Sequence, residues 1–318
     1  MMSMENRIAS ESNKKFLSGL MGKITPDNQL HHPLGESVTA ASNRTIGKLL
    51  VQSGRLRFED AEQIAAAQKT SGVRFGEMGV TLGLLTDAEV RVALSDQYGY
   101  NYLEPGQGNF SQELVAAYQP FTPQAEVMRK LRTELLLRWF NADRKALALV
   151  SPAQGDGRSY LAANLAVAFA QLGESTLLID ADMRNPRLHK IFNCDDSIGL
   201  SGILGGRANS YLDGISRVSE LPNLSILSAG AIPPNPLELL GKIDFQLLLA
   251  FLSESYGIVL IDSPCTASHT DARVVAARAG GALIIARKNV TRAADLKGLT
   301  DAFTASGTSI VGTVMNNR

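Results

Sequence analysis

The chain has 318 residues, enough for two domains of ordinary size. Hydrophobic residues make up 45% of it and charged residues 19%, which is typical of a soluble globular protein. Because 31 basic residues balance 31 acidic ones, the overall charge gives no support for a nucleic-acid partner.

Cysteine content and hydropathy predict the compartment. Cys194 and Cys265 are too far apart for a Cys-x-x-Cys metal motif and too few for a disulfide framework, so we expect reduced thiols. No apolar run approaches the roughly 18 residues of a membrane helix, and the first residues lack the apolar core of a secretory signal. We therefore expect a cytoplasmic protein that reaches a membrane only through a partner.

The N-terminal third contains a leader and an internal repeat. Residues 1–43 show no sustained apolar period, which predicts a disordered leader with one short helix around residues 16–21. The units 45–68 and 74–97 then repeat Gly, Gly and Gln at the same offsets, and Thr86 to Glu89 forms a capping box before an apolar run. Each unit is predicted to be a short helix, a glycine turn and a longer helix. Together they form a helical domain over 44–105, and a linker over 106–124 follows.

From residue 125 onward, apolar strands alternate with helices. A helix over 125–140 is followed by candidate strands at 146–150, 176–179, 224–227, 258–261, 282–286 and 310–315. This alternation predicts a doubly wound α/β domain with a mainly parallel sheet over 125–318. Ligands of such folds bind at the carboxyl ends of the strands.

A glycine-rich loop, Ser151 to Ser159, connects the first strand to a helix. The strict Walker pattern is broken twice, because Ser151 replaces the first glycine and Arg158 replaces the lysine. Gly155 and Gly157 still allow backbone amides to converge on an anion, and the helix N-terminus adds its dipole. The loop by itself is equally compatible with a plain strand-to-helix turn.

Carboxylates at strand ends favour the phosphate-site interpretation. Asp180 and Asp182 follow the second strand at a spacing that points both side chains the same way. Asp262 ends a later strand in the manner of a Walker B aspartate. Because carboxylates at apolar strand ends cost desolvation energy, solvated surface is a poor explanation of this set. We predict that one carboxylate holds a Mg²⁺ water while the other accepts a hydroxyl proton.

These motifs resemble the deviant Walker (MinD/ParA-like) P-loop NTPases. Within them, residues 123–318 resemble the bacterial tyrosine kinases (BY-kinases) of capsule and exopolysaccharide systems. The residues that carry this resemblance are Asp180, Asp182 and Arg184 after the second strand, and Glu126, Arg129 and Arg132 before the first. With the added N-terminal domain, the chain is similar to the chain-length-determinant kinases of the EpsG type.

The resemblance implies an ATP- and Mg²⁺-dependent protein-tyrosine kinase that regulates exopolysaccharide chain length and export. Asp180 would be the general base, with Asp182 and Arg158 in the catalytic set. ATP or ADP would contact Gly155, Asp156, Gly157, Arg158, Ser159, Tyr160 and Asn316, and Mg²⁺ would be held by Ser159, Asp182 and Asp262.

The resemblance also implies partners. A membrane polysaccharide co-polymerase would recruit the chain to the inner membrane and complete its site. Glu126, Arg129 and Arg132 would join copies into a homo-oligomer, as a ring; the alternative is a solvated ion-pair face.

Two departures support another interpretation, a nucleotide-binding scaffold or regulator. Arg158 in place of lysine predicts slow catalysis. Because the last tyrosine is Tyr256, a tyrosine tail cluster of the family is missing and the substrate would be another protein.

The repeat resembles the N-terminal domains of type II secretion and type IV pilus ATPases, some of which bind cyclic di-GMP. Thr45 stands in the first unit where Arg74 stands in the second, so a strong contact to a guanine is missing. This substitution favours protein docking over cyclic di-GMP.

Overall fold

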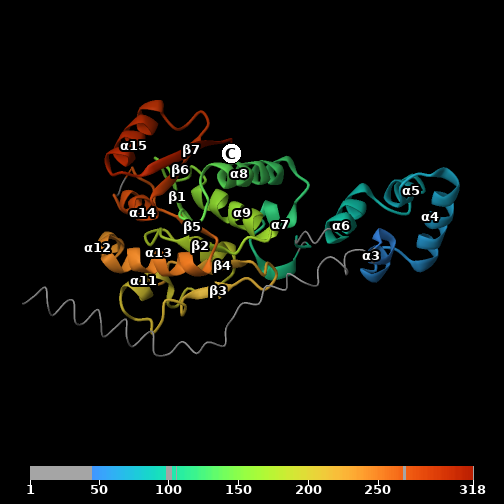
Figure 1. Ribbon diagram of the computed structural model, residues 1–318, viewed down its shortest axis with the longest axis horizontal. Helices are drawn as coiled ribbons and strands as arrows, with labels where there is room; N and C mark the ends of the chain where they lie inside the picture. The colour runs from blue at the N-terminus through green and yellow to red at the C-terminus, as the bar shows by residue number, and fades with distance from the viewer. Residues whose placement is uncertain (1–44, 98–101, 105, 268–269, 318) are drawn as a thin grey trace, which may run out of the picture. The chain divides into compact units, whose positions relative to one another are not determined.

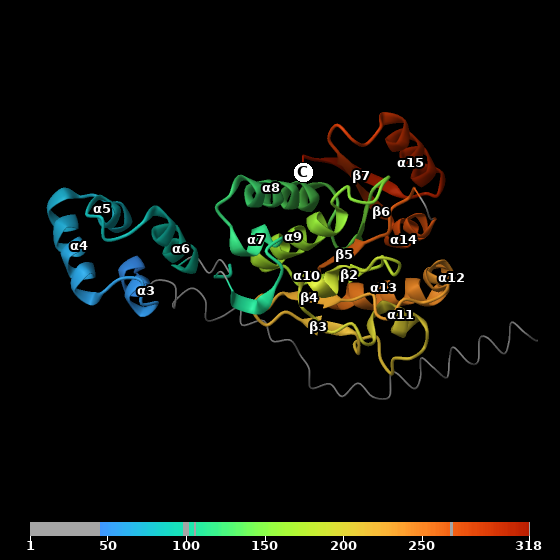
Figure 2. The same ribbon diagram turned by 180° about the vertical axis from the view of Figure 1, so that it is seen from behind.

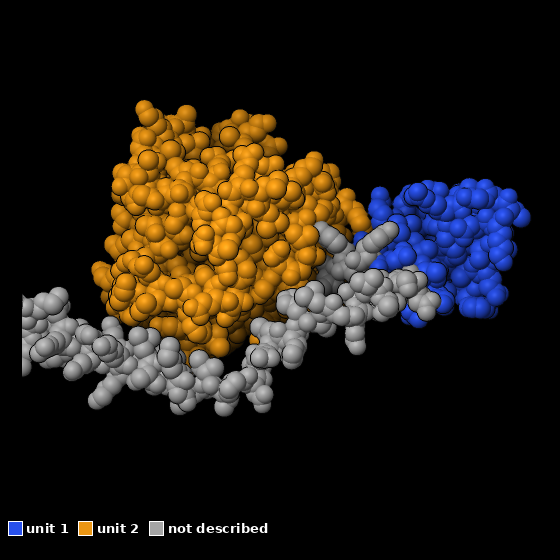
Figure 3. Space-filling view, viewed as in Figure 1, with its two compact units in different colours: residues 1–99 blue, residues 100–318 orange. Residues whose placement is uncertain are grey.

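The computed structural model describes residues 45–97, 102–104, 106–267 and 270–317 (Figure 1). The chain divides into two compact units, residues 1–99 and 100–318, whose described residues are coloured blue and orange in Figure 3. The leader predicted over 1–43, with its short helix, lies outside the described residues. We describe each unit by itself.

The described part of the first unit consists of two interlocked helical repeats. Its helices are α3 (Ile46–Gln52), α4 (Phe58–Ser71), α5 (Phe75–Thr81) and α6 (Asp87–Gln97). Gly54 and Gly83 form the turns within the repeats with φ of 72° and 68°, a left-handed conformation that favours glycine. Helix α3 packs mainly against α6, and α4 against α5, so each short helix packs on the long helix of the other repeat.

The second unit is built on a seven-stranded sheet in the order β3-β4-β2-β5-β1-β6-β7. The strands are β1 (Ala146–Val150), β2 (Thr176–Asp180), β3 (Ile215–Arg217), β4 (Leu224–Leu227), β5 (Ile258–Asp262), β6 (Gly281–Arg287) and β7 (Ser309–Asn316). All neighbouring pairs are parallel except β3 with β4. The predicted doubly wound, mainly parallel fold is confirmed. The short edge strand β3 was not predicted, because Ile215 is its sole apolar residue.

Helices cover both faces of this sheet, as Figures 1 and 2 show from opposite sides. Alternate residues of β1 belong to different cores: Leu147 and Leu149 pack with α7, α8 and α9, whereas Ala148 and Val150 pack with helices on the other face. The helices of the second unit are α7 (Val115–Tyr118), α8 (Pro123–Arg138), α9 (Arg158–Gln171), α10 (Leu188–Ile191), α11 (Gly199–Leu204), α12 (Pro236–Gly241), α13 (Ile243–Ser255), α14 (Asp271–Ala279) and α15 (Ala293–Ala305), with a short 3₁₀ helix at Gln107–Asn109.

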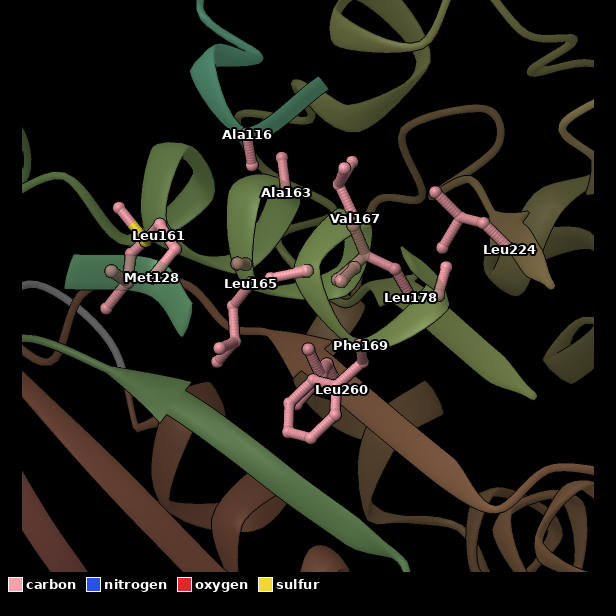
Figure 4. Close-up of a cluster of buried hydrophobic side chains, with 14 of the residues drawn as sticks. Ala116, Met128, Leu161, Ala163, Leu165, Val167, Phe169, Leu178, Leu224 and Leu260 are labelled. Carbon is pink, nitrogen blue, oxygen red and sulfur yellow. The ribbon is translucent and has the colours of Figure 1, made fainter. Parts of the chain in front are cut away.

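Helix α9 is the centre of the first core, and every one of its residues is buried. Figure 4 shows its side chains between Ala116 of α7, Met128 of α8 and strand residues that include Leu178 and Leu260. This position fixes the N-terminus of α9 at the carboxyl edge of the sheet. None of the helices in the described residues has the length and apolar character needed to cross a membrane.

The segment predicted as a linker, 106–124, instead belongs to the α/β unit. Leu114 and the four residues of α7 are at most 8% exposed. Asn164 of α9 accepts a hydrogen bond from the Ala116 amide at 2.9 Å and donates to the Glu113 carbonyl at 2.8 Å, while Gln171 donates to the Ala116 carbonyl at 2.9 Å. The Gly- and Pro-containing composition was misleading, because side chains of a buried helix satisfy the polar backbone here.

Candidate functional site

The loop between β1 and α9 is held in shape by its glycines and by one buried aspartate. Gly155 and Gly157 have φ of 84° and 96°. Asp156 is 1% exposed, and its Oδ2 accepts a hydrogen bond from the Ala153 amide at 2.9 Å. Asn316, at the end of β7, donates from Nδ2 to the Asp156 carbonyl at 2.9 Å, and a Cβ on Gly157 would collide with that nitrogen. The structure therefore brings these predicted nucleotide-binding residues together.

Helix α9 begins at Arg158, and no side-chain hydrogen bond caps its N-terminus in the described structure. The first amides of an α-helix lack intrahelical acceptors, and the helix dipole adds positive potential there. The loop and the first turn thus form a backbone surface suited to a phosphate group. The side chain of Tyr160 packs in the hydrophobic core, so its backbone amide is the group that faces this end.

Asp180 and Asp262 are register neighbours on β2 and β5, and both are at most 1% exposed. Oδ1 of Asp180 accepts a hydrogen bond from the Asp182 amide at 3.1 Å, and Oδ2 accepts from the amides of Arg187 and Leu188, each at 3.0 Å. Asp180 thereby fixes the turn over 182–188, which carries Asp182. Burial and the neighbouring Asp262 raise the pKa of Asp180 well above its ordinary value.

Asp262 is buried without a hydrogen bond to either carboxylate oxygen within the described residues. Burial raises its pKa to about 6, although the Arg158 charge and the Ser159 hydroxyl act in the opposite direction. The hydroxyl is thus close enough to lower the pKa, but it lies outside hydrogen-bonding geometry. A buried carboxylate with no donors is costly, and a bound cation would offset that cost.

The side chain of Arg158 turns inward and is 7% exposed. Its Nε donates to the Ser263 carbonyl at 2.7 Å, and its Nη1 donates to the Ser151 hydroxyl at 2.6 Å. Nη2 lies 3.3 Å from Oδ2 of Asp182, and Nε lies 3.9 Å from Oδ1 of Asp262. The sequence pointed to Arg158 as a site residue, but it gave no signal that a backbone carbonyl after β5 would hold it.

The oxygen groups at this edge fit a hard divalent cation. Ser159, Asp182 and Asp262 are all at most 9% exposed, and oxygen ligands are those that Mg²⁺ prefers. In the part of the chain that the structure describes, no group of three or more His, Cys, Asp or Glu side chains is arranged to hold a metal. An ion here would therefore depend on phosphate oxygens and water for most of its ligands, as Mg²⁺ commonly does.

Two arginines after β2 support the site from outside. Arg184 donates from Nε to Asp271 at 2.7 Å, which ties the turn over 182–188 to the first turn of α14. Arg187 pairs with Glu113 at 3.0 Å. Neither partner was predicted, because an acidic residue at a helix start or in an irregular segment has many ordinary roles.

The three predicted interface residues of α8 do not share one environment. Arg129 forms an ion pair with Glu126 at 2.7 Å and donates to the Pro120 carbonyl at 2.7 Å, on an exposed part of the helix. Arg132 is 8% exposed and donates from Nη1 to the Ala168 carbonyl of α9 at 2.9 Å. The expectation that all three residues share an accessible face therefore does not hold for Arg132, which is turned into the α8–α9 packing.

Comparisons with known proteins bear on this arrangement. The tyrosine-protein kinase Ptk of Acinetobacter johnsonii is 34% identical over 192 residues, which are 60% of this chain and 26% of Ptk. The tyrosine-protein kinase YwqD of Bacillus subtilis is 30% identical over 205 residues, which are 64% of this chain and 86% of YwqD. The chain belongs to the bacterial tyrosine-kinase family.

A solved structure agrees with this membership. The kinase domain of the Escherichia coli tyrosine kinase ETK superposes with a TM-score of 0.62 at 27% identity, covering 64% of this chain and 79% of that domain. No protein-family model matches the chain. The region of Ptk that this bacterial tyrosine-kinase chain matches is about a quarter of the length of Ptk.

Proposed function

We propose that the chain is an ATP- and Mg²⁺-dependent protein-tyrosine kinase of the EpsG type, which regulates the chain length and export of an exopolysaccharide. The observation that carries the proposal is the convergence of the loop Gly155–Ser159 with Asp182 and Asp262 at one edge of the sheet. Membership of a family of tyrosine kinases supports the reaction class.

The loop amides and the first turn of α9 would hold the β- and γ-phosphates, and Arg158 would neutralise part of their charge. Ser159, Asp182 and Asp262 would hold Mg²⁺, which supplies charge neutralisation of the phosphates. Phosphoryl transfer depends mostly on positioning and charge stabilisation, so this small set of groups is sufficient.

Asp180 is proposed as the general base for a tyrosine hydroxyl. A raised pKa makes its carboxylate a stronger base, which suits this role. Its burial and its hydrogen bonds to the turn over 182–188 mean that this turn has to open for a tyrosine to reach it. Asp182, at 6% exposure, lies closer to the surface and is the natural comparison.

The proposed partner is a membrane polysaccharide co-polymerase, whose cytoplasmic segment recruits the chain to the inner membrane and activates it. Glu126 and Arg129 would join copies of the chain into a homo-oligomer, as a ring, because they form a charged surface pair on α8. The helical unit would dock a protein rather than cyclic di-GMP.

Nucleotide binding is the first test. We expect Mg²⁺–ADP to bind by calorimetry, and Gly157→Ala to weaken it more than tenfold, because a Cβ there is strained at φ 96° and collides with Asn316. Gly280→Ala is the matched control, since Gly280 has φ 77° with nothing near its Cβ position and lies at the end of α14. Absence of ADP binding at millimolar concentration would refute the proposal.

Phosphoryl transfer is the second test. The full chain is incubated with γ-labelled ATP, Mg²⁺, a tyrosine-bearing polypeptide and the co-polymerase segment. Asp182→Asn is expected to lower transfer about 100- to 1000-fold through loss of a charge-stabilising group. Asp180→Asn should nearly abolish transfer, as expected of a base that acts when the proton leaves, while metal-free ADP affinity, which depends on the loop amides rather than on the turn over 182–188, stays within about twofold. Full activity of Asp180→Asn would remove Asp180 from the catalytic set.

A second candidate function is a nucleotide-dependent scaffold without catalysis. The observation that favours it is the engagement of both Asp180 oxygens by backbone amides in a fully buried position. Tight Mg²⁺–ADP binding together with no transfer under the conditions above would establish this alternative.

A further inference from the structure

The two departures from the strict Walker pattern contact each other. Ser151 replaces the first glycine and Arg158 replaces the lysine, and the Nη1 of Arg158 donates to the Ser151 hydroxyl at 2.6 Å. The hydroxyl in turn donates to the Ala153 carbonyl at 2.8 Å, which fixes it in the loop. A glycine at 151 would offer no such acceptor, so the serine and the arginine act as a pair.

The guanidinium uses its planar fork in three directions at once. One nitrogen bonds the Ser151 hydroxyl, one bonds the Ser263 carbonyl, and the third approaches Asp182. A lysine ammonium is a single point charge and cannot make this set of contacts across the same span. Ser151 and Ser263 are both 0% exposed, so the anchors themselves are firmly placed.

This position conflicts with a divalent cation. The guanidinium lies 3.3 Å from Asp182 and 3.9 Å from Asp262, the two carboxylates that fit the metal. A divalent ion bound to the same oxygens would meet a positive charge within a few ångströms, in a buried place where water screens little. Arg158 and the metal therefore cannot both occupy this edge as it stands.

We propose that Arg158 is an internal counter-ion of Asp182 and Asp262, which keeps divalent cations out until the phosphates of a nucleotide draw the guanidinium away. The inference rests on the nucleotide function proposed above. It assigns Ser151 as the residue that holds Arg158 in the excluding position, and it makes metal binding conditional on nucleotide binding.

The test uses electron paramagnetic resonance to measure the binding of Mn²⁺ to the full-length chain in the absence of nucleotide. Arg158→Gln is expected to bind Mn²⁺ at least tenfold more tightly than the parent. Ser151→Gly keeps the charge but removes the anchor, so a smaller gain of a few-fold is expected. Arg187→Gln is the matched control, because the Arg187 charge also acts on Asp262 but its side chain pairs with Glu113 outside the site.

The outcomes separate the inference from the proposed function. If the parent binds Mn²⁺ as tightly as Arg158→Gln, or if neither binds it at millimolar concentration, Arg158 is not what excludes the metal. An equal gain of Mn²⁺ affinity in Arg187→Gln would show that loss of any nearby positive charge has the same effect, and would also overturn the proposal. Circular dichroism confirms folding, and a misfolded Arg158→Gln leaves Ser151→Gly, whose unchanged affinity would then count against the proposal.

Metal-free ADP titrations in the presence of a chelator complete the experiment. If phosphates draw Arg158 outward, Arg158→Gln should lose at least fivefold in ADP affinity relative to the parent. A parent that binds ADP neither in the chelator nor with Mg²⁺, together with a gain of Mn²⁺ affinity in Arg158→Gln, would refute the proposed function and leave the counter-ion role standing. An unchanged ADP affinity in a parent that does bind ADP would contradict the release step.

Discussion

The two units of the chain differ in what they bury. In the helical unit, none of the described buried residues is polar or charged, and Leu50 and Ile64 at its centre are 0% exposed. The α/β unit buries several charged groups at one edge of its sheet, namely Asp156, Arg158, Asp180, Asp182 and Asp262. The helical unit has one apolar core and the α/β unit has one on each face of its sheet, so the buried charges are an addition to ordinary packing in the α/β unit only.

This difference indicates where a binding site is expected in the α/β unit. Burying a charge is unfavourable unless it is paired or hydrogen-bonded, so a cluster of buried carboxylates makes this edge of the sheet a candidate site. The helical unit has no such cluster in its described residues. Stability and function should therefore respond to mutation in opposite ways in the two units.

The largest effect on stability is expected in the helical unit. Ile64→Ala removes a fully buried side chain, which should lower the free energy of unfolding by about 2–5 kcal/mol. A unit of this size has little stability to lose, so it should unfold while the α/β unit and its ADP affinity remain unchanged. Far-ultraviolet circular dichroism on heating measures the unfolding of the helical unit, and ADP binding measured in parallel reports whether the α/β unit is intact.

Leu94→Ala is the control for that variant, because Leu94 is 38% exposed on α6 and should cost far less. Loss of ADP binding in Ile64→Ala would show that the two units are energetically coupled, and the contrast between them would fail.

The second prediction concerns Asp262, where a substitution should raise the free energy of unfolding instead of lowering it. Its pKa is raised from 3.8 to about 6 in the folded chain, so the folded state binds the extra proton between these values and loses stability as the pH rises through them. Asp262→Asn removes this penalty and should stabilise the chain by roughly 1–3 kcal/mol above pH 7. Denaturant unfolding at several pH values should show the gain shrinking toward pH 4.

The same variant should weaken Mg²⁺-dependent ADP binding more than metal-free ADP binding. A loss of stability at neutral pH would show that the interaction of the Asp262 carboxylate with Arg158 outweighs the cost of its burial, and would contradict this prediction.

The smallest effect on stability is expected at the surface of α8. Arg129→Ala breaks the ion pair with Glu126 and the hydrogen bond to the Pro120 carbonyl, which together contribute roughly 1–2 kcal/mol to the monomer. If the pair joins copies of the chain, the molar mass measured by light scattering should nevertheless fall from that of an oligomer to that of a monomer. Arg138→Ala breaks a comparable exposed pair with Glu134 on the same helix and should leave the oligomeric state intact.

An unchanged mass for Arg129→Ala would show that the pair is a solvated surface feature. Arg132→Ala is not a clean test of the interface, because it also removes a hydrogen bond to α9 inside the α/β unit.

Much of the architecture was predictable from sequence, because buried parallel strands are continuous apolar runs. The ends of β1 and β4 agree with the prediction, and β2 and β5 extend one residue further, to Asp180 and Asp262. The strand-end aspartates and the glycine loop follow from the same pattern. The partners of Arg158 could not be predicted, since a hydroxyl within the loop and a carbonyl after β5 become neighbours only through the sheet order.

The predicted linker over 106–124 was also wrong. Residues 106–124 carry loop-forming residue types, yet they run along α9 and use its side chains to satisfy their backbone. Hydrogen bonds between segments about 50 residues apart leave no periodic signal in either segment, so composition alone assigned this region to a linker.

Those hydrogen bonds also determine where the chain can be divided. A fragment trimmed to begin at α8 would lose the hydrogen bonds that Asn164 and Gln171 of α9 form with the Glu113 and Ala116 backbone. It would also expose to water the apolar face of α9 that α7 covers, at a cost of roughly 25 cal/mol for each Å² of apolar surface. A fragment that begins near residue 100 keeps this cover, so for dissection, expression and crystallisation the α/β unit has to include residues 106–124, although their composition is that of a linker.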